Sequence, residues 1–155
     1  MVAIFPRSTP STSNLTFNTT GNVAWVGSGG TALNVGNGTS TGHNVSVTNN
    51  AGLSTSGSIT ASGTLDIDTT GNNGNIALGA NASGTAVTVS ANGSGAISQS
   101  AGILTGTTSI ALTSSSGAIG SLNIATPNWT ANTTGNVTLV DSTATTGNGI
   151  STGHN

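Results

Sequence analysis

The sequence predicts an all-β protein folded as a right-handed parallel β-helix, or β-solenoid, with about 21 residues in each coil. Three observations support this prediction. Short apolar runs recur at nearly constant spacing along the chain. Thr, Ser, Asn and Gly, which suit tight turns, make up well over half of the sequence. No stretch shows the three-to-four spacing of apolar residues that a helix requires.

The apolar content sets the kind of core that the chain can build. Val, Ile, Leu and Phe together make up about a fifth of the chain, which is too little for a thick two-layer core. The chain also has one Arg, no Lys and three acidic residues, so charge repulsion does not keep it disordered. A thin core that runs through stacked coils reconciles these two facts.

The shortage of charge and of cysteine excludes several classes of partner. Without a basic patch, the chain has no contacts for the phosphates of nucleic acids or for anionic membrane surfaces. No apolar run is long enough to cross a bilayer, and no cysteine is available for disulfides or thiolate metal sites. We therefore expect no nucleic-acid partner, no membrane insertion and no cofactor.

The first segment, residues 1–13, lies outside the repeats that follow. It begins with an apolar run, residues 1–5, and continues with a stretch bounded by prolines that breaks the pattern. Three roles are open for it: a cap, a strand that docks on a neighbouring chain, or a foreign segment.

A long internal repeat organises the rest of the chain. Residues 14–23 return as residues 128–137 with eight of ten positions identical, at an offset of 114. Residues 36–44 return as residues 147–155, at an offset of 111. Two such matches in the same order do not arise by chance.

The repeat divides the chain into one full solenoid unit, residues 14–127, and the start of a second unit, residues 128–155. Two explanations are open. The chain is either a window from a longer tandem array or a subunit whose similar ends allow copies to continue one another. We favour the array.

Within the unit, short apolar runs form two interleaved series. In each series the leading apolar residues stand about 21 residues apart, which is the length expected for one coil. The first series is led by Val23, Val45, Leu65, Val87 and Ile110, and the second by Leu33, Leu53, Ile76, Ile97 and Ile119. The simplest account is two strands in each coil, with like residues stacked on like.

Stacking would satisfy the backbone donors and acceptors of each coil by pairing them with those of its neighbours. Gly and Asn at the corners, as in residues 69–75, permit the positive φ values that tight turns require. About seven coils at about 4.8 Å each would form a rod of roughly 30 Å.

Two runs rich in Ser, Gly and Ala, residues 57–67 and 93–102, resemble the filamentous-haemagglutinin type of bacterial exoprotein. The resemblance covers residues 14–155 in style and includes no secretion-domain signature. It implies a very long right-handed β-helix that is exported through an outer-membrane partner and serves in adhesion, aggregation or biofilm. By this resemblance the chain is a piece of the shaft at the bacterial cell surface.

Asp66 and Asp68 alternate along one expected strand, so both carboxylates project to the same face. Such a pair suits calcium or glycoside hydrolysis. However, no third carboxylate is near in sequence, and the calcium-binding nonapeptide pattern is missing. We therefore expect a solvent-facing pair that is only a weak metal candidate. Asp141 follows an apolar run and is expected in a turn.

His43 and His154 occupy the same Gly-His-Asn position in the two repeats. We expect an exposed turn histidine, because no cluster of further metal ligands accompanies either one. No serine lies in a Gly-x-Ser-x-Gly strand–turn–helix element, so no nucleophile has an identifiable base. We predict no catalytic residue and no enzymatic activity.

The chain contains nine Asn-x-Ser/Thr sequons, most of which are expected from its composition alone. The alternative is that some carry sugars, as in the glycosylated high-molecular-weight adhesins that resemble this group. The candidate acceptors are Asn18, Asn132 and Asn136. The other six sequons begin at Asn14, Asn37, Asn44, Asn81, Asn92 and Asn128.

Two further surface roles have weaker support. Trp25 and Trp129 could stack on sugar rings, but a Trp in a strand is more often packed or capping. Stacked Thr faces of solenoids can bind ice, yet no Thr-x-Thr column recurs at constant coil spacing.

The sequence as a whole predicts a structural shaft module of a secreted fibrous surface protein or extracellular filament. Its expected partners are further copies of itself, by array or by end-to-end stacking, and host or cell-surface glycans. The alternative function is a carbohydrate-binding or glycan-processing β-helix, followed by an ice-binding solenoid.

Overall fold

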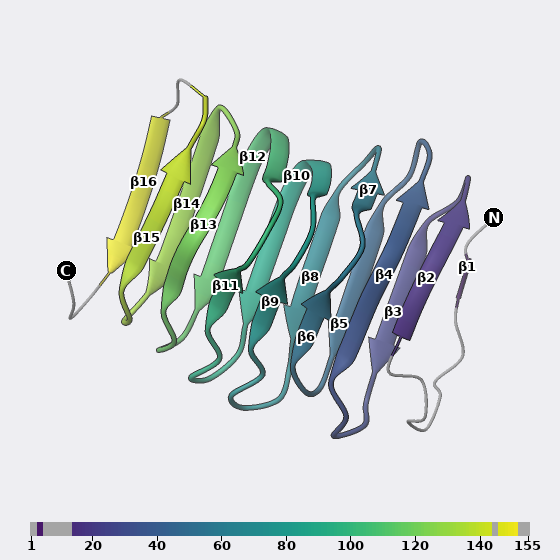
Figure 1. Ribbon diagram of the computed structural model, residues 1–155, viewed down its shortest axis with the longest axis horizontal. Coiled ribbons are helices and arrows are strands. Elements are labelled where there is room, and N and C mark those ends of the chain that lie inside the picture. The colour runs from purple at the N-terminus through teal and green to yellow at the C-terminus, as the bar shows by residue number, and fades with distance from the viewer. Residues whose placement is uncertain (1–2, 5–13, 144–145, 152–155) are drawn as a thin grey trace.

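The computed structural model describes residues 3–4, 14–143 and 146–151 (Figure 1). Sixteen strands form one sheet, and no helix occurs within the described residues. The strands are β1 (Ala3–Ile4), β2 (Asn14–Thr19), β3 (Val23–Gly27), β4 (Leu33–Ser40), β5 (Val45–Asn49), β6 (Leu53–Thr55), β7 (Ile59–Ala61), β8 (Leu65–Thr69), β9 (Ile76–Leu78), β10 (Ala82–Ala91), β11 (Ile97–Gln99), β12 (Leu104–Ser114), β13 (Ile119–Ala125), β14 (Asn128–Thr133), β15 (Val137–Asp141) and β16 (Thr146–Ser151).

The strands wind into a right-handed solenoid. In Figure 1 the chain ascends along the nearer strands, such as β6 and β9, and descends along the farther strands, such as β8 and β10, as it advances toward its C-terminal end. Six successive parallel pairings connect β3 to β16, so this part of the chain makes about six turns. The predicted parallel β-solenoid is confirmed.

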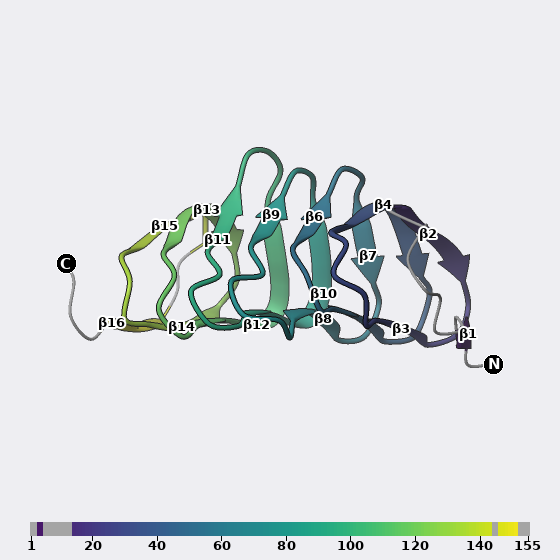
Figure 2. The same cartoon turned by 90° about the horizontal axis from the view of Figure 1, so that it is seen from below.

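Each coil has three faces, which we define by their columns of paired strands. Face A contains β1, β3, β5, β8, β14, β16 and the C-terminal parts of β10 and β12. Face A is flat along its length (Figure 2). Face B contains β6, β9, β11 and the first residues of β4, β13 and β15. Face C contains β7, the ends of β2, β4, β13 and β15, and the first residues of β10 and β12, while the first residues of β2 lie on face B.

The expectation of two strands per coil is wrong, because face C is a third column. Two physical features hid it. Its strand residues run on into a neighbouring face without a break, as in β4, β10 and β12. Its apolar series is also interrupted, because the small or polar residues Gly38, Ser40 and Ala82 stand among inward residues such as Ile59 and Leu104.

The two predicted apolar series are confirmed as stacked columns of the core. On face A the register partners on successive coils are Val23, Val45, Leu65, Val87 and Ile110. On face B they are Leu33, Leu53, Ile76, Ile97 and Ile119. Every one of these side chains is at most 3 % exposed, so each contributes about 1.5–3 kcal/mol of burial.

Asparagine side chains join the coils at the corners. In five places within the described residues an Asn Oδ1 atom accepts the backbone N–H of a residue on the next coil over 2.8–3.1 Å, and Asn73 accepts the N–H of Ser94 in the same way over 3.4 Å. These bonds replace strand pairing where the chain turns, which explains why Asn is abundant. The pairs are Asn22 with Asn44, Asn37 with Ser58, Asn44 with Thr64, Asn75 with Ala96 and Asn81 with Ile103.

Hydroxyl groups at the ends of strands also point inward. The side chains of Ser40, Thr69, Ser114 and Thr133 are buried, and each donates to the carbonyl oxygen of a glycine over 2.6–2.8 Å. Because these buried polar groups are bonded, they do not destabilise the core. They close the corners of a core that has few apolar residues.

Two large rings lie over glycines of the adjacent coil. Phe17 covers Gly38, and Trp129 covers Gly147, so that a side chain at either glycine would meet ring atoms. Glycine is therefore required at these positions by the close approach of the next coil. The rings fill the space that the missing side chains leave.

The two copies of the sequence repeat lie on different faces. Residues 14–19 form β2, which pairs with β4 on faces B and C, whereas the matching residues 128–133 form β14 on face A. Local structure is nevertheless retained, because Thr19 and Thr133 each accept a hydrogen bond from the backbone N–H two residues later, at 3.0 and 2.9 Å. The proposed unit boundary at residue 128 falls within one continuous solenoid.

Part of the N-terminal segment, residues 1–13, extends face A. Ala3 and Ile4 pair in parallel with Val23 and Ala24 of β3. The other residues of the segment lie outside the described residues, so the choice between a cap, a docking strand and a foreign segment stays a prediction.

Truncation of an inward valine should destabilise the solenoid far more than truncation of an outward one. Val47 is fully buried on face A, whereas Val26 on the same face is 56 % exposed. We expect Val47→Ala to lower the free energy of unfolding by about 2 kcal/mol, from two lost methyl groups and the cavity that remains. Val26→Ala should change it by less than about 0.5 kcal/mol. Equal losses in urea denaturation would contradict the burial pattern.

Candidate functional site

The two neighbouring acidic residues lie on β8 in the middle of face A. Asp66 pairs with Ser46 and Thr88, and Asp68 pairs with Thr48 and Ser90. Both carboxylates point outward, while the alternate residues of β8, such as Ile67, are buried. The strand therefore presents its acidic pair on one face, as its alternation predicts.

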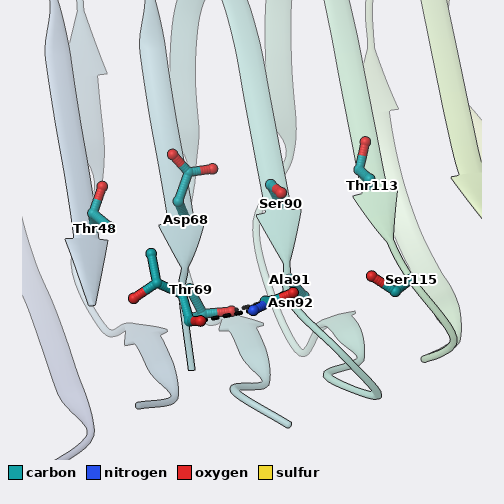
Figure 3. A pocket seen from close by; sticks show the side chains of 9 residues that line it. Thr48, Asp68, Thr69, Ser90, Ala91, Asn92, Thr113 and Ser115 are labelled. Atoms are coloured by element: carbon teal, nitrogen blue, oxygen red, sulfur yellow. Dashed lines mark hydrogen bonds between the residues drawn. The ribbon is translucent and has the colours of Figure 1, made fainter. Parts of the chain in front are cut away.

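A shallow hollow of about 610 Å³ lies beside Asp68, where the strands of face A end (Figure 3). We call it the Asp68 hollow. Its lining is polar apart from one alanine, and it is built from four adjacent coils. The residues that line it are Thr48, Asp68, Thr69, Thr70, Ser90, Ala91, Asn92, Thr113 and Ser115.

Asp68 has an unfavourable electrostatic environment. Burial of its carboxyl raises its pKa above the ordinary value of 3.8, and the nearby charge of Asp66 raises it further. No described residue donates a hydrogen bond to this carboxylate or forms an ion pair with it. A half-buried charge without a partner costs free energy, so the ionised Asp68 does not stabilise the folded state.

One corner of the Asp68 hollow is rigid. The Asn92 side-chain amide donates to the carbonyl oxygen of Thr70 over 2.7 Å, and its Oδ1 atom accepts from the backbone N–H of Gly93 over 2.9 Å. The buried Thr69 hydroxyl accepts from the Asn92 backbone N–H at 3.3 Å. The rim at this corner is thus fixed in position by hydrogen bonds.

Within the described part of the chain, the structure brings no further metal ligand close to the acidic pair. Among the described residues, no group of three or more His, Cys, Asp or Glu side chains could hold a metal ion. Asp141 lies elsewhere, at the end of β15, where its Oδ1 atom accepts from the N–H and the hydroxyl of Thr143 at 3.0 and 2.9 Å. Asp141 therefore stabilises a turn.

His43 is exposed in the turn before β5, and its carbonyl oxygen accepts the N–H of Gly63 on the next coil. Its repeat counterpart His154 lies outside the described residues. Trp25 and Trp129 are partly buried against the core. This packing leaves less of either ring for sugars to stack on.

The structure divides the nine sequons into two groups. The amides of Asn14, Asn37, Asn44, Asn81, Asn92 and Asn128 are engaged in hydrogen bonds, mostly to adjacent coils. Those of Asn18, Asn132 and Asn136 are exposed and make no side-chain hydrogen bond with any described residue. The three candidate acceptors are thus the sequons that the solenoid does not itself use.

The outward columns of face A are too irregular for an ordered threonine array. One column reads Ala24, Ser46, Asp66, Thr88, Ala111 and Thr130, and the other reads Val26, Thr48, Asp68, Ser90, Thr113 and Asn132. Carboxylates and apolar side chains interrupt the hydroxyls of both columns. The geometry gives no support to ice binding.

No family model, curated protein or solved structure matches this chain. Within its described residues, no helix is long and apolar enough to span a membrane. The geometry of the solenoid is therefore the evidence on its function. Sequence reasoning found Asp68 but missed the other residues of the Asp68 hollow, although the spacing of the first apolar series would have placed Thr48, Ser90 and Thr113 beside it.

Replacement of Asp68 should stabilise the protein in a pH-dependent way. The folded state raises the pKa of this carboxyl above 3.8. Its contribution to stability is therefore most favourable below pH 3.8 and is lost as the pH rises through the raised pKa. We expect Asp68→Asn to raise the free energy of unfolding at neutral pH by up to about 1 kcal/mol, because solvent screens the half-exposed charge. Thermal denaturation should show no gain well below pH 3.8. A gain of the same size at both pH values would contradict this account.

Removal of a bonded asparagine should cost more than removal of a free one. Asn44→Ala takes away the Oδ1 atom that accepts the Thr64 N–H at 2.9 Å, so we expect a loss of about 1–2 kcal/mol. Asn132→Ala is the matched control, since this sequon asparagine makes no such bond, and it should change stability by less than about 0.5 kcal/mol. Denaturant unfolding of both variants measures the difference. Equal effects would show that the corner bonds do not stabilise the solenoid.

Proposed function

We propose that this chain is a structural shaft module of a secreted fibrous surface protein or extracellular filament, a cell-surface scaffold for adhesion or biofilm. The uninterrupted stacking of its coils carries this proposal. From β3 to β16, each strand of face A pairs in parallel with the next. Such stacking converts chain length directly into rod length, because each coil adds about 4.8 Å.

The surface chemistry favours a mechanical role. The whole chain carries one basic and three acidic residues, and its formal net charge is −2. A surface with so little charge has no means of steering a highly charged partner. Most outward residues of face A are small and uncharged, apart from Asp66 and Asp68, so this flat side of the rod carries little charge.

The partner that we propose first is another copy of the same repeat. The identity between residues 14–23 and 128–137 supports continuation of one unit into the next. This continuation is either a tandem array within one chain or the stacking of separate chains, in which parallel strand edges with little charge pair readily. Host or cell-surface glycans are the second proposed partner, and the proposed location is extracellular.

A carbohydrate-binding β-helix is the alternative function, and the Asp68 hollow is the observation that favours it. Glycan processing has less support. Glycosidases place two carboxyl groups on either side of the scissile bond. Asp66 and Asp68 instead lie on one strand and project from one face. We therefore propose no enzymatic activity.

Electron cryo-microscopy of the native material, combined with its intact mass, tests the shaft. We expect a continuous rod with an axial repeat of about 4.8 Å per coil. A constituent chain much heavier than 14.7 kDa would indicate a tandem array, and rods of many joined 14.7 kDa chains would indicate stacking. Discrete particles of 14.7 kDa without rods would overturn the proposal.

A further inference from the structure

The Asp68 hollow contains a feature that a shaft does not need. A rod requires stacked strands and filled corners, and neither requires a half-buried carboxylate without a partner. Because the whole chain has only three acidic residues, the presence of one of them in a hollow of face A suggests a use other than packing. The surroundings of Asp68 indicate what that use is.

Unused hydroxyl groups surround this carboxylate. Thr48, Ser90 and Thr113 lie on neighbouring strands and point to the same side as Asp68 (Figure 3). Their hydroxyls, and that of Ser115, make no hydrogen bond with any described residue. The hollow thus offers a row of free donors and acceptors that follows the rod axis at about 4.8 Å per step.

The chemistry of this row limits the ligand. An anion would be repelled by Asp68, since none of the described residues that line the hollow is basic. A flat aromatic ligand would find no aromatic side chain to stack on among the described lining residues. Calcium requires six to eight oxygen ligands, and the described part of the lining supplies a single carboxylate. A neutral ligand with many hydroxyl groups satisfies every constraint, because its hydroxyls can donate to Asp68 and exchange hydrogen bonds with Ser and Thr.

We propose that the Asp68 hollow binds a segment of a neutral oligosaccharide, with Asp68 as the main hydrogen-bond acceptor. This assignment rests on the proposed glycan partner and specifies its chemistry. Thr48, Ser90 and Thr113 supply further donors and acceptors along the sugar chain, and the fixed Asn92 forms one wall. The ligand lies along the rod axis, since the hollow crosses four coils in that direction. Binding at one such open site is weak and gains strength by repetition along a rod.

The test is a ¹⁵N NMR titration of the full chain with a panel of neutral oligosaccharides, namely malto-, cello- and manno-oligosaccharides. We expect at least one of them to shift the amide signals of Thr48, Ser90, Asn92 and Thr113. Asp68→Asn should weaken this binding by about tenfold, because it removes hydrogen bonds to a charged acceptor. Asp66→Asn is the matched control on the same strand, and it should weaken binding by less than about twofold.

Three results would overturn the proposal. The first is that no oligosaccharide of the panel shifts these signals. The second is that Asp66→Asn weakens binding as much as Asp68→Asn. The third is that calcium chloride alone shifts the same signals and the sugars do not. A second variant, Ser90→Ala, distinguishes local contact from loss of fold, since it should weaken sugar binding while the circular dichroism spectrum stays unchanged. None of these results depends on whether the native material forms rods.

Discussion

Parallel pairing between coils is the interaction on which the rest of the structure depends. Each strand inside the stack has its hydrogen-bonding partners one coil away along the chain in either direction, as Val45 has in Val23 and Leu65. A side chain that points inward must therefore stack on its counterpart in the next coil. A thin column of β-branched residues and Leu is enough to fill such a core, which is why a chain with so few apolar residues still folds.

The same requirement explains the unusual composition. Where the chain turns, strand pairing stops, and the backbone groups need other partners. Asparagine supplies them from outside the coil, as where the Asn44 Oδ1 atom accepts the Thr64 N–H. Buried hydroxyls supply them from inside, as where the Ser114 hydroxyl donates to the Gly95 carbonyl oxygen. Glycine allows coils to approach closely, as Gly38 does beneath Phe17. The abundance of Asn, Ser, Thr and Gly therefore reflects the number of corners.

The sequence predicts those parts of the fold that leave a periodic apolar signal. The columns that begin at Val23 and Leu33 are such parts, and both are confirmed. Face C left only an interrupted signal, because small or polar residues such as Gly38 and Ser40 stand between its apolar inward positions. The Asp68 hollow could be predicted only in part, since its walls depend on which residues of successive coils are paired. A slip of two residues in that register would place another residue beside Asp68 in place of Ser90.

The long repeat and the coil have different periods, and this difference affects what the rod displays. The five coils that separate Val23 from Trp129 on face A contain fewer residues than the repeat offset of 114. The number of residues by which the repeat offset exceeds five coils corresponds to about one face of a three-faced coil. Residues 14–19 and 128–133 consequently lie on different faces. In a continuing array, each unit would turn its surface features to the next face, so that Asn18 and its equivalents would point in several directions around the rod. Such a shaft would present the same chemistry to a surface on any side, which suits multivalent contact by a fibre that has no preferred orientation.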